Sequence, residues 1–155
     1  MQQQFMRKAI ELSIENVRSG KGGPFGAVVV KDGKIIATGV NQVTASNDPT
    51  AHAEVVAIRN ACTVLGSFQL TDCELYSSCE PCPMCLGAIY WARPKVVYYA
   101  NSKHDAAHIN FDDSFIYEQI ALPHTQRTIL FIQEMREEGL VAFLLWQETQ
   151  DKIKY

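Results

Sequence analysis

Apolar positions recur along the chain with two periods, which predict helices alternating with strands. Over residues 3–18 the apolar side chains follow a helical spacing, and three glycines and a proline within 20–24 end that helix. Residues 25–30 and 34–40 then predict two strands, joined by Asp32-Gly33, a dipeptide typical of hairpin turns. The first 40 residues therefore predict a helix followed by a β-hairpin.

The rest of the chain continues this alternation. A loop at 47–50 precedes a helix whose apolar side chains are spaced four and three residues apart up to Leu65. Beyond it the pattern predicts in order a strand, a short helix, a strand, a helix, a fifth strand and a last helix, at 73–78, 82–91, 96–100, 113–120, 129–132 and 134–152. We therefore expect an α/β fold of three layers, α/β/α, with a mixed five-stranded sheet, in a single domain over residues 1–155.

Composition narrows the class of partner. The 155 residues carry a net charge of −3, with no run of Lys or Arg longer than two, so no basic stripe is predicted for a nucleic-acid backbone. The longest apolar run near the end, 140–146, is far shorter than the roughly 20 residues of a membrane span, and the N-terminus lacks a signal-peptide core. Five cysteines, three of them within seven residues, indicate a reducing, cytoplasmic environment. We expect a small-molecule substrate, with no nucleic acid and no membrane.

Two motifs carry candidate metal chemistry. His52-Ala53-Glu54 is followed, thirty residues after the histidine, by Cys82 and Cys85 in a Pro-Cys-Pro-Met-Cys sequence. One imidazole and two thiolates are three zinc ligands that leave a fourth tetrahedral position open, and a carboxylate beside an open position suits the activation of water. Both motifs follow turn signals, so we expect two helix N-termini to converge on the metal, where their N–H groups favour thiolate.

Other interpretations of the cysteines leave part of the two motifs without a role. Cys82 and Cys85 also fit a thioredoxin-type redox pair, which would leave the histidine and the glutamate without a role. Cys79 could be a fourth ligand of a closed structural zinc site, which would remove the open position. Cys62 lies on the apolar stripe of a predicted helix and Cys73 begins a predicted strand, so both are interpreted as core residues.

The His-x-Glu motif followed by Pro-Cys-x-x-Cys is the signature of zinc deaminases. Because it carries this motif, the chain resembles the cytidine-deaminase superfamily, in particular the small bacterial guanine deaminases. The resemblance extends over GGPFGA at 22–27, NDPTAHAE at 47–54, SCEPCPMCLGAIYWAR at 78–93, FDDSFIY at 111–117 and the terminal Tyr155. It implies a cytidine-deaminase-like fold, one Zn²⁺ per chain, a homodimer, and hydrolytic deamination of guanine to xanthine and ammonia in purine catabolism.

The mechanism implied by this resemblance gives each polar residue a role. Zinc, held by His52, Cys82 and Cys85, lowers the pKa of its bound water to about 7, and the hydroxide attacks the amine-bearing carbon. Glu54 takes the water proton, delivers it to the adjacent ring nitrogen and later helps to protonate the departing ammonia. The resemblance also implies substrate contacts from Phe25, Asn41, Ala53, Asp113 and Tyr155, the last from the chain's own tail or a partner's.

These substrate contacts have simpler interpretations, and the substrate has alternatives. Asn41 could be a turn residue after a strand, Asp113 a helix cap and Tyr155 a disordered terminus. The tRNA adenosine deaminases share the hairpin and the zinc motifs, but the last third of this chain mixes acidic with basic residues, which is unfavourable for RNA. Another amino-heterocycle deaminase, or a non-catalytic zinc module, also fits the metal motifs.

Overall fold

The computed structural model describes residues 2–155, in which the chain divides after Asp113 into two compact units. The first unit contains one four-stranded sheet, built from β1 (Gly26–Lys31), β2 (Lys34–Val40), β3 (Glu74–Cys79) and β4 (Val96–Asn101) in the order β2-β1-β3-β4. β1 pairs antiparallel with β2 and β3, and β3 pairs parallel with β4, so the predicted mixed sheet is confirmed.

The expected fifth strand at 129–132 is wrong. Within residues 2–155 this segment forms no ladder with another strand, and its apolar side chains are exposed. A short apolar run predicts burial, but it does not predict the neighbouring strand with which a strand must pair. For this reason the apolar pattern alone predicted one strand too many.

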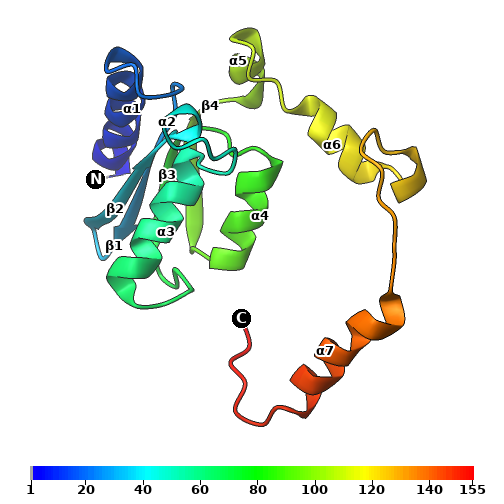
Figure 1. Ribbon diagram of the computed structural model, residues 1–155. Helices are drawn as coiled ribbons and strands as arrows, with labels where there is room; N and C mark the ends of the chain where they lie inside the picture. The colour runs from blue at the N-terminus through cyan, green and yellow to red at the C-terminus, as the bar shows by residue number, and fades with distance from the viewer. Residues whose placement is uncertain (1) are drawn as a thin grey trace. The chain divides into compact units, whose positions relative to one another are not determined.

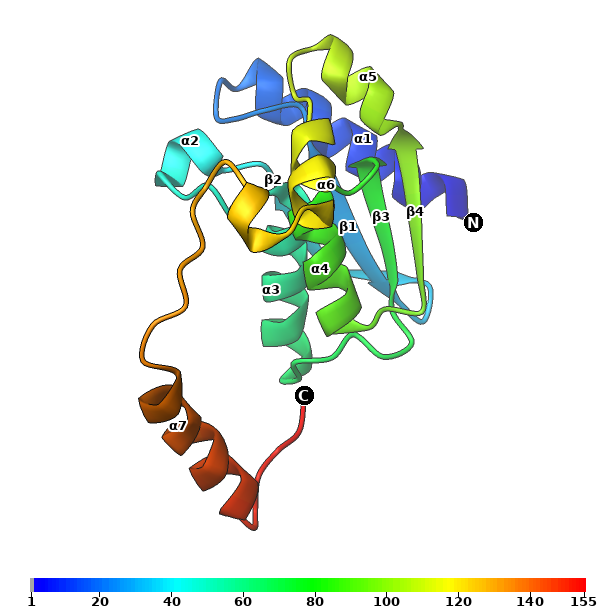
Figure 2. The same ribbon diagram turned by 90° about the vertical axis from the view of Figure 1, so that its right-hand side faces the viewer.

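Helices cover both faces of the sheet in the first unit (Figures 1 and 2). Helix α1 (Gln2–Arg18) lies on one face, and α3 (Ala53–Leu65) and α4 (Pro83–Ala92) lie on the other. The middle strand β1 faces both layers: Val28 belongs to a core cluster with Phe5 of α1, whereas Val29 belongs to a second cluster with Ala57 of α3. This alternation confirms the predicted α/β/α layering within the first unit.

The start of α3 lies directly against β2. At Gly39 of β2, a Cβ atom would lie 2.2 Å from the carbonyl oxygen of Ala53 and 2.5 Å from the backbone nitrogen of Ala57. No side chain fits between strand and helix here, so glycine allows the close approach. The contact fixes the position of the first turn of α3 relative to the sheet.

Two short helices of the first unit were not predicted. α2 (Val43–Ser46) follows β2, and α5 (Lys103–His108) follows β4. α5 begins with a capping box, in which the Ser102 hydroxyl accepts from the backbone of Asp105 and the Asp105 carboxylate accepts from the backbone of Ser102.

The second unit contains α6 (Ser114–Ala121), the 3₁₀ turn His124–Gln126 and α7 (Arg136–Glu148). The Arg127 guanidinium donates to the carbonyl oxygens of Gln119 and Leu122, at 3.0 and 3.2 Å, and lies 4.9 Å from the ring centre of Phe131. These contacts fold the segment after α6 back onto the end of that helix. Among residues 2–155, no helix combines the length and apolarity needed to span a bilayer.

Candidate metal centre and active-site pocket

The three predicted zinc ligands lie at the beginnings of α3 and α4. His52 is the N-cap residue of α3, and Cys82 is the N-cap residue of α4, whose first helical residue is Pro83. Cys85 lies in the first turn of α4 and is fully buried. Proline suits the first turn because its missing N–H would have no partner within the helix. The two helices meet at their N-termini, as the motif positions predict.

The geometry of the three side chains fits a tetrahedral zinc ion. Their ligand atoms all lie within 4.8 Å of one another, and His52 Nδ1 is 3.5 Å from the Sγ atoms of both Cys82 and Cys85. Zinc–sulfur and zinc–nitrogen bonds of about 2.3 and 2.1 Å at a tetrahedral angle separate nitrogen from sulfur by about 3.6 Å. The donor set and its spacing therefore both suit zinc.

Cys79 is not part of this group. The side chain of Cys79 at the end of β3 contacts the carbonyl oxygen of Ser102 at 3.7 Å, and burial raises the pKa of its thiol to about 11. Among the described residues, the group that could hold a metal comprises one histidine and two cysteines. The fourth coordination position is thus left to a ligand from outside the chain, as a catalytic site requires.

Charge in the ligand group is concentrated on one sulfur. A hydrogen bond from the Cys85 thiol, together with His52, lowers the pKa of Cys82 to about 4. The same hydrogen bond and burial raise the pKa of Cys85 well above its usual value. The hydrogen bond with Cys82 raises the pKa of His52. At neutral pH Cys82 is thus a thiolate, which His52 and Cys85 stabilise as donors.

Glu54 lies beside the ligand group without belonging to it. The side chain is in the first turn of α3, and the residue is only 6% exposed. Its Oε1 accepts a hydrogen bond from Ser77 Oγ at 3.0 Å, and its Oε2 lies 3.4 Å from Cys85 Sγ. Burial raises the pKa of the Glu54 carboxyl, so this group can hold a proton more readily than an exposed glutamate.

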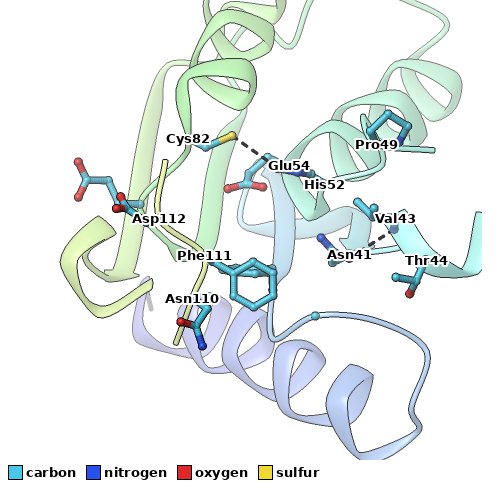
Figure 3. A pocket seen from close by; sticks show the side chains of 13 residues that line it. Asn41, Val43, Thr44, Pro49, His52, Glu54, Cys82, Asn110, Phe111 and Asp112 are labelled. Atoms are coloured by element: carbon cyan, nitrogen blue, oxygen red, sulfur yellow. Dashed lines mark hydrogen bonds between the residues drawn. The ribbon is translucent and has the colours of Figure 1, made fainter. Parts of the chain in front are cut away.

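A pocket of about 420 Å³ opens onto the metal centre (Figure 3). Its wall combines the metal-site residues with residues of the short helix α2 and of loops: Gly23, Phe25, Asn41, Val43, Thr44, Pro49, His52, Glu54, Glu80, Cys82, Asn110, Phe111 and Asp112. The rings of Phe25 and Phe111 meet edge to face, with centres 5.0 Å apart and planes at 87°. The cavity has the size and the largely apolar character of a small-molecule site.

A buried amide behind the wall joins two of these loops. Asn16 Nδ2, near the end of α1, donates to the carbonyl oxygens of Gly23 and Asn41, both at 2.9 Å. The side chain of Asn41 is oriented by the residue two positions later, because the backbone N–H of Val43 donates to its Oδ1 at 3.3 Å. Gly22 leaves room for this junction, since a Cβ there would lie 2.2 Å from the carbonyl oxygen of Asn41. The loops are thus positioned from inside the protein.

The other predicted substrate contacts, Asp113, Ala53 and Tyr155, are not among the residues that line the pocket. Asp113 does not line the pocket, whereas its neighbour Asp112 does; burial and the nearby charge of Cys82 raise the pKa of Asp113. The side chain of Ala53 packs in the core, which leaves only its backbone for a substrate contact. Tyr155 belongs to the second unit and is 71% exposed. The roles of these residues remain predictions.

Sequence reasoning missed several residues that build the site. Phe111 lies in the pocket wall, and Asn16 and Ser77 support it from behind. Ser77 had a signal, because a pair of hydroxyls in an otherwise apolar strand is unusual and a buried polar group needs a partner. Asn16 had none, because a polar residue near the end of a helix is ordinarily exposed.

Comparison with known proteins agrees with the site. A family model, the cytidine and deoxycytidylate deaminase zinc-binding region, matches residues 1–101. Guanine deaminase of Bacillus subtilis is 61% identical over 151 residues, which cover 97% of each chain. The X-ray structure of guanine deaminase from B. subtilis is similar with a TM-score of 0.96 at 60% identity, covering 99% of this chain and 98% of that chain.

More distant relatives also match most of the chain. The tRNA-specific adenosine deaminase of Haemophilus influenzae is 32% identical over 164 residues, covering 97% of this chain and 94% of that protein. The structure of NE0047 in complex with 2,6-diaminopurine is 31% identical with a TM-score of 0.67, covering 89% of this chain and 68% of that one. The resemblance inferred from the motifs is confirmed, and the chain belongs to the cytidine and deoxycytidylate deaminase family of zinc-binding proteins.

Proposed function

We propose that the chain is a zinc-dependent guanine deaminase, which hydrolyses guanine to xanthine and ammonia. The observation that carries this proposal is Glu54, a buried carboxylate at the floor of a purine-sized pocket, beside three zinc ligands but not among them. A structural zinc site has no use for a carboxylate in this position. The similarity to B. subtilis guanine deaminase over nearly the whole chain supports guanine as the substrate.

His52, Cys82 and Cys85 would hold the ion. The chemistry that zinc supplies when bound is the activation of water, whose pKa falls to about 7. Glu54 would accept the first proton from this water and pass it to the ring nitrogen beside the reacting carbon as the C–O bond forms. It would then accept the second proton from the added hydroxyl and deliver it to the amine as the C–N bond breaks and the new carbonyl forms. The raised pKa of the buried carboxyl suits a group that must both take up and release a proton. Guanine and water thereby become xanthine and ammonia with all atoms accounted for.

The pocket wall would orient the purine. Because Oδ1 of Asn41 accepts from the backbone of Val43, the Nδ2 hydrogens are the part of this amide that can donate to the acceptor edge of guanine. Phe25, braced edge to face by Phe111, offers an apolar surface to the ring. We assign Asp113 to the ring donors and include the backbone of Ala53 among the contacts.

The second unit, residues 114–155, would take part in the association of two chains. We propose a homodimer, because the described part of residues 114–155 exposes many large apolar side chains, including Phe131, Phe143 and Leu145, which monomers seldom expose together. In this arrangement Tyr155 reaches a pocket of its own chain or of the partner. The single functional domain over 1–155 and the cytoplasmic location remain predictions, the latter consistent with five free cysteines.

A panel of substrates tests the function. Ammonia release is measured from guanine, adenine, cytosine, cytidine and an anticodon-stem RNA by the zinc-loaded protein. We expect guanine to be turned over with a kcat/KM at least about 100-fold above the others, because the site donates to one edge and accepts from another. Turnover of the RNA alone would instead identify a tRNA adenosine deaminase, and no turnover of any substrate would identify a non-catalytic zinc module.

Truncation and sedimentation test the assembly. Deletion of residues 151–155 should lower kcat/KM for guanine while zinc content and the melting temperature stay unchanged. Tyr155→Phe, which keeps the ring, is the matched control for the hydroxyl. A fully active monomer in sedimentation, or a truncated enzyme with full activity, would contradict the proposed assembly or the proposed role of the tail.

A further inference from the structure

Ser77 is a buried hydroxyl that the proposed reaction leaves without a role. It lies near the end of β3, is 2% exposed, and does not line the pocket. Its Oγ donates to Glu54 Oε1 at 3.0 Å, across 23 residues of sequence. A buried hydroxyl whose proton is aimed at a buried carboxylate oxygen is a defined hydrogen bond rather than a surface contact that water could replace.

The direction of this hydrogen bond is fixed from the other side. The backbone N–H of Cys79 donates to Ser77 Oγ at 3.4 Å, so the hydroxyl accepts from the strand and turns its own proton towards Glu54. Ser77 is held in the sheet, and Glu54 is held in the first turn of α3. The hydrogen bond thus locks the carboxylate to the rigid sheet.

The two oxygens of Glu54 consequently face different surroundings. Oε1 is occupied by Ser77, whereas Oε2 is the oxygen next to the metal ligands, 3.4 Å from Cys85 Sγ. A carboxylate free to rotate about its last bond would present either oxygen, and it would lose alignment with the reacting atoms as it turned. With Oε1 occupied, one oxygen alone is presented to the ligand group.

We propose that Ser77 is a positioning residue for the deamination, which holds Glu54 so that Oε2 carries the proton between water and substrate. This inference rests on the proposed function. It assigns no chemistry to Ser77 itself, which contacts neither the pocket nor the ligand group. Its removal should affect the chemical step rather than the binding of metal or purine.

Substitution of Ser77 by threonine, valine and alanine in the zinc-loaded protein tests this proposal. Threonine keeps the hydroxyl, and valine has nearly the same shape without it, so any packing change is common to both. We expect Ser77→Val and Ser77→Ala to lower kcat for guanine about 10- to 100-fold, and Ser77→Thr to restore most of the activity. KM and zinc content should stay close to those of the unmodified chain in all three variants.

Ser78 is the matched control. It is as deeply buried as Ser77, but as the next residue of the same strand it points to the other face of the sheet, and its Oγ accepts from the backbone N–H of Gly26. Ser78→Ala removes an identical group and should lower the melting temperature without changing kcat. Equal kcat losses in Ser78→Ala and Ser77→Ala would show that both effects come from packing, and would overturn the proposal.

The proposal can fail separately from the function it rests on. Lack of guanine turnover by the unmodified chain refutes the function, whereas equal kcat for the threonine and valine variants refutes the role of Ser77. Crystal structures of the zinc-loaded threonine and valine variants provide a test without turnover. Glu54 should keep one orientation in the first and adopt a rotated one in the second, and the same orientation in both would overturn the inference.

Discussion

The two ends of the pocket are built in different ways. The metal end comes from two short segments, 52–54 and 82–85, at the starts of two helices that pack on the sheet. The end proposed to bind the purine comes from loops at 23–25 and 110–112 and from residues 41–49, which include the four-residue helix α2. Helix ends fixed by a core set positions closely, whereas loops tolerate substitution and can change in shape.

This difference separates the chemistry from the choice of substrate. The residues that activate water are the ones that the family motif contains, and they are the same whichever amino-heterocycle is used. The side chains proposed to distinguish guanine from adenine, those of Asn41 and Asp113, lie outside the motif. Variants at the metal end should therefore stop the reaction, and variants at the purine end should change which ring reacts.

Glu54→Gln should produce the largest effect. It keeps the size of the side chain and removes its ability to take up a proton, so kcat for guanine should fall about 100- to 10 000-fold. Zinc content, measured by atomic emission, should remain one per chain. Glu74→Gln is a suitable control, because this carboxylate at the opposite end of β3 accepts only from Tyr76. A glutamine variant with normal kcat would contradict the proposed role of Glu54.

Zinc affinity should rise with pH. Cys82, with a pKa of about 4, is already a thiolate at neutral pH and releases nothing when the metal binds. The pKa of Cys85 is raised well above its usual value, so this thiol holds a proton that zinc must displace, and the raised pKa of His52 widens the pH range in which its imidazole competes with zinc for a proton. Between pH 6 and 8 we expect affinity to rise about tenfold per pH unit for each proton displaced.

Calorimetric titration of the chelator-treated protein in buffers of different ionisation enthalpy counts these protons. A zinc affinity that does not change with pH would show that the ligands are deprotonated before the metal arrives. In that case the hydrogen bond from the Cys85 thiol to the Cys82 thiolate does not describe the apoprotein.

Asn41→Ala tests the purine end. Loss of the amide should lower kcat/KM for guanine about 10- to 100-fold, since one edge of the purine loses its donor. Zinc content should not change, because Asn41 is not part of the ligand group. A variant that loses guanine and adenine turnover equally would place Asn41 in general positioning rather than in substrate choice.

Asn16→Ala should have the smallest effect on activity. Two carbonyl oxygens would lose their donor, so we expect a stability loss of about 1–3 kcal/mol and a KM for guanine raised about threefold, with kcat little changed. Ser13→Ala is the control on the same helix, because that buried hydroxyl donates only within α1, to Ile10. A KM unaffected by Asn16→Ala would mean that the loops keep their positions without this amide.

The sequence predicted the metal end better than the purine end for a physical reason. Ligand spacing is local, so His52, Glu54, Cys82 and Cys85 were identified from the motifs and are placed together by the structure. Helices and strands with clear periodicity were predicted, whereas α2 and α5, with four and six residues, are too short to show a period.

Long-range contacts explain what the sequence did not indicate. Ser77 reaches Glu54 because β3 packs against α3 in the folded chain. Asn16 reaches the carbonyl oxygen of Asn41 because α1 ends beside the pocket loops. The apolar run at 129–132 indicated a strand but contained nothing about which edge it would pair with, and the described chain provides no such pairing. Partners in tertiary structure, rather than residue types, were the missing information.

The way in which α3 and α4 begin has a consequence for how the enzyme loses its metal. The Ser102 capping box closes the first turn of α5, but neither His52 nor Cys82 makes a side-chain cap at the helix it begins. An N-cap hydrogen bond is worth about 1 kcal/mol, so both first turns should fray more readily than that of a capped helix. His52 and Cys82 begin these turns and Cys85 lies in the second of them, so opening of either turn should release a metal ligand. Amide hydrogen exchange in the two turns and inactivation by a chelator should then proceed through the same opening.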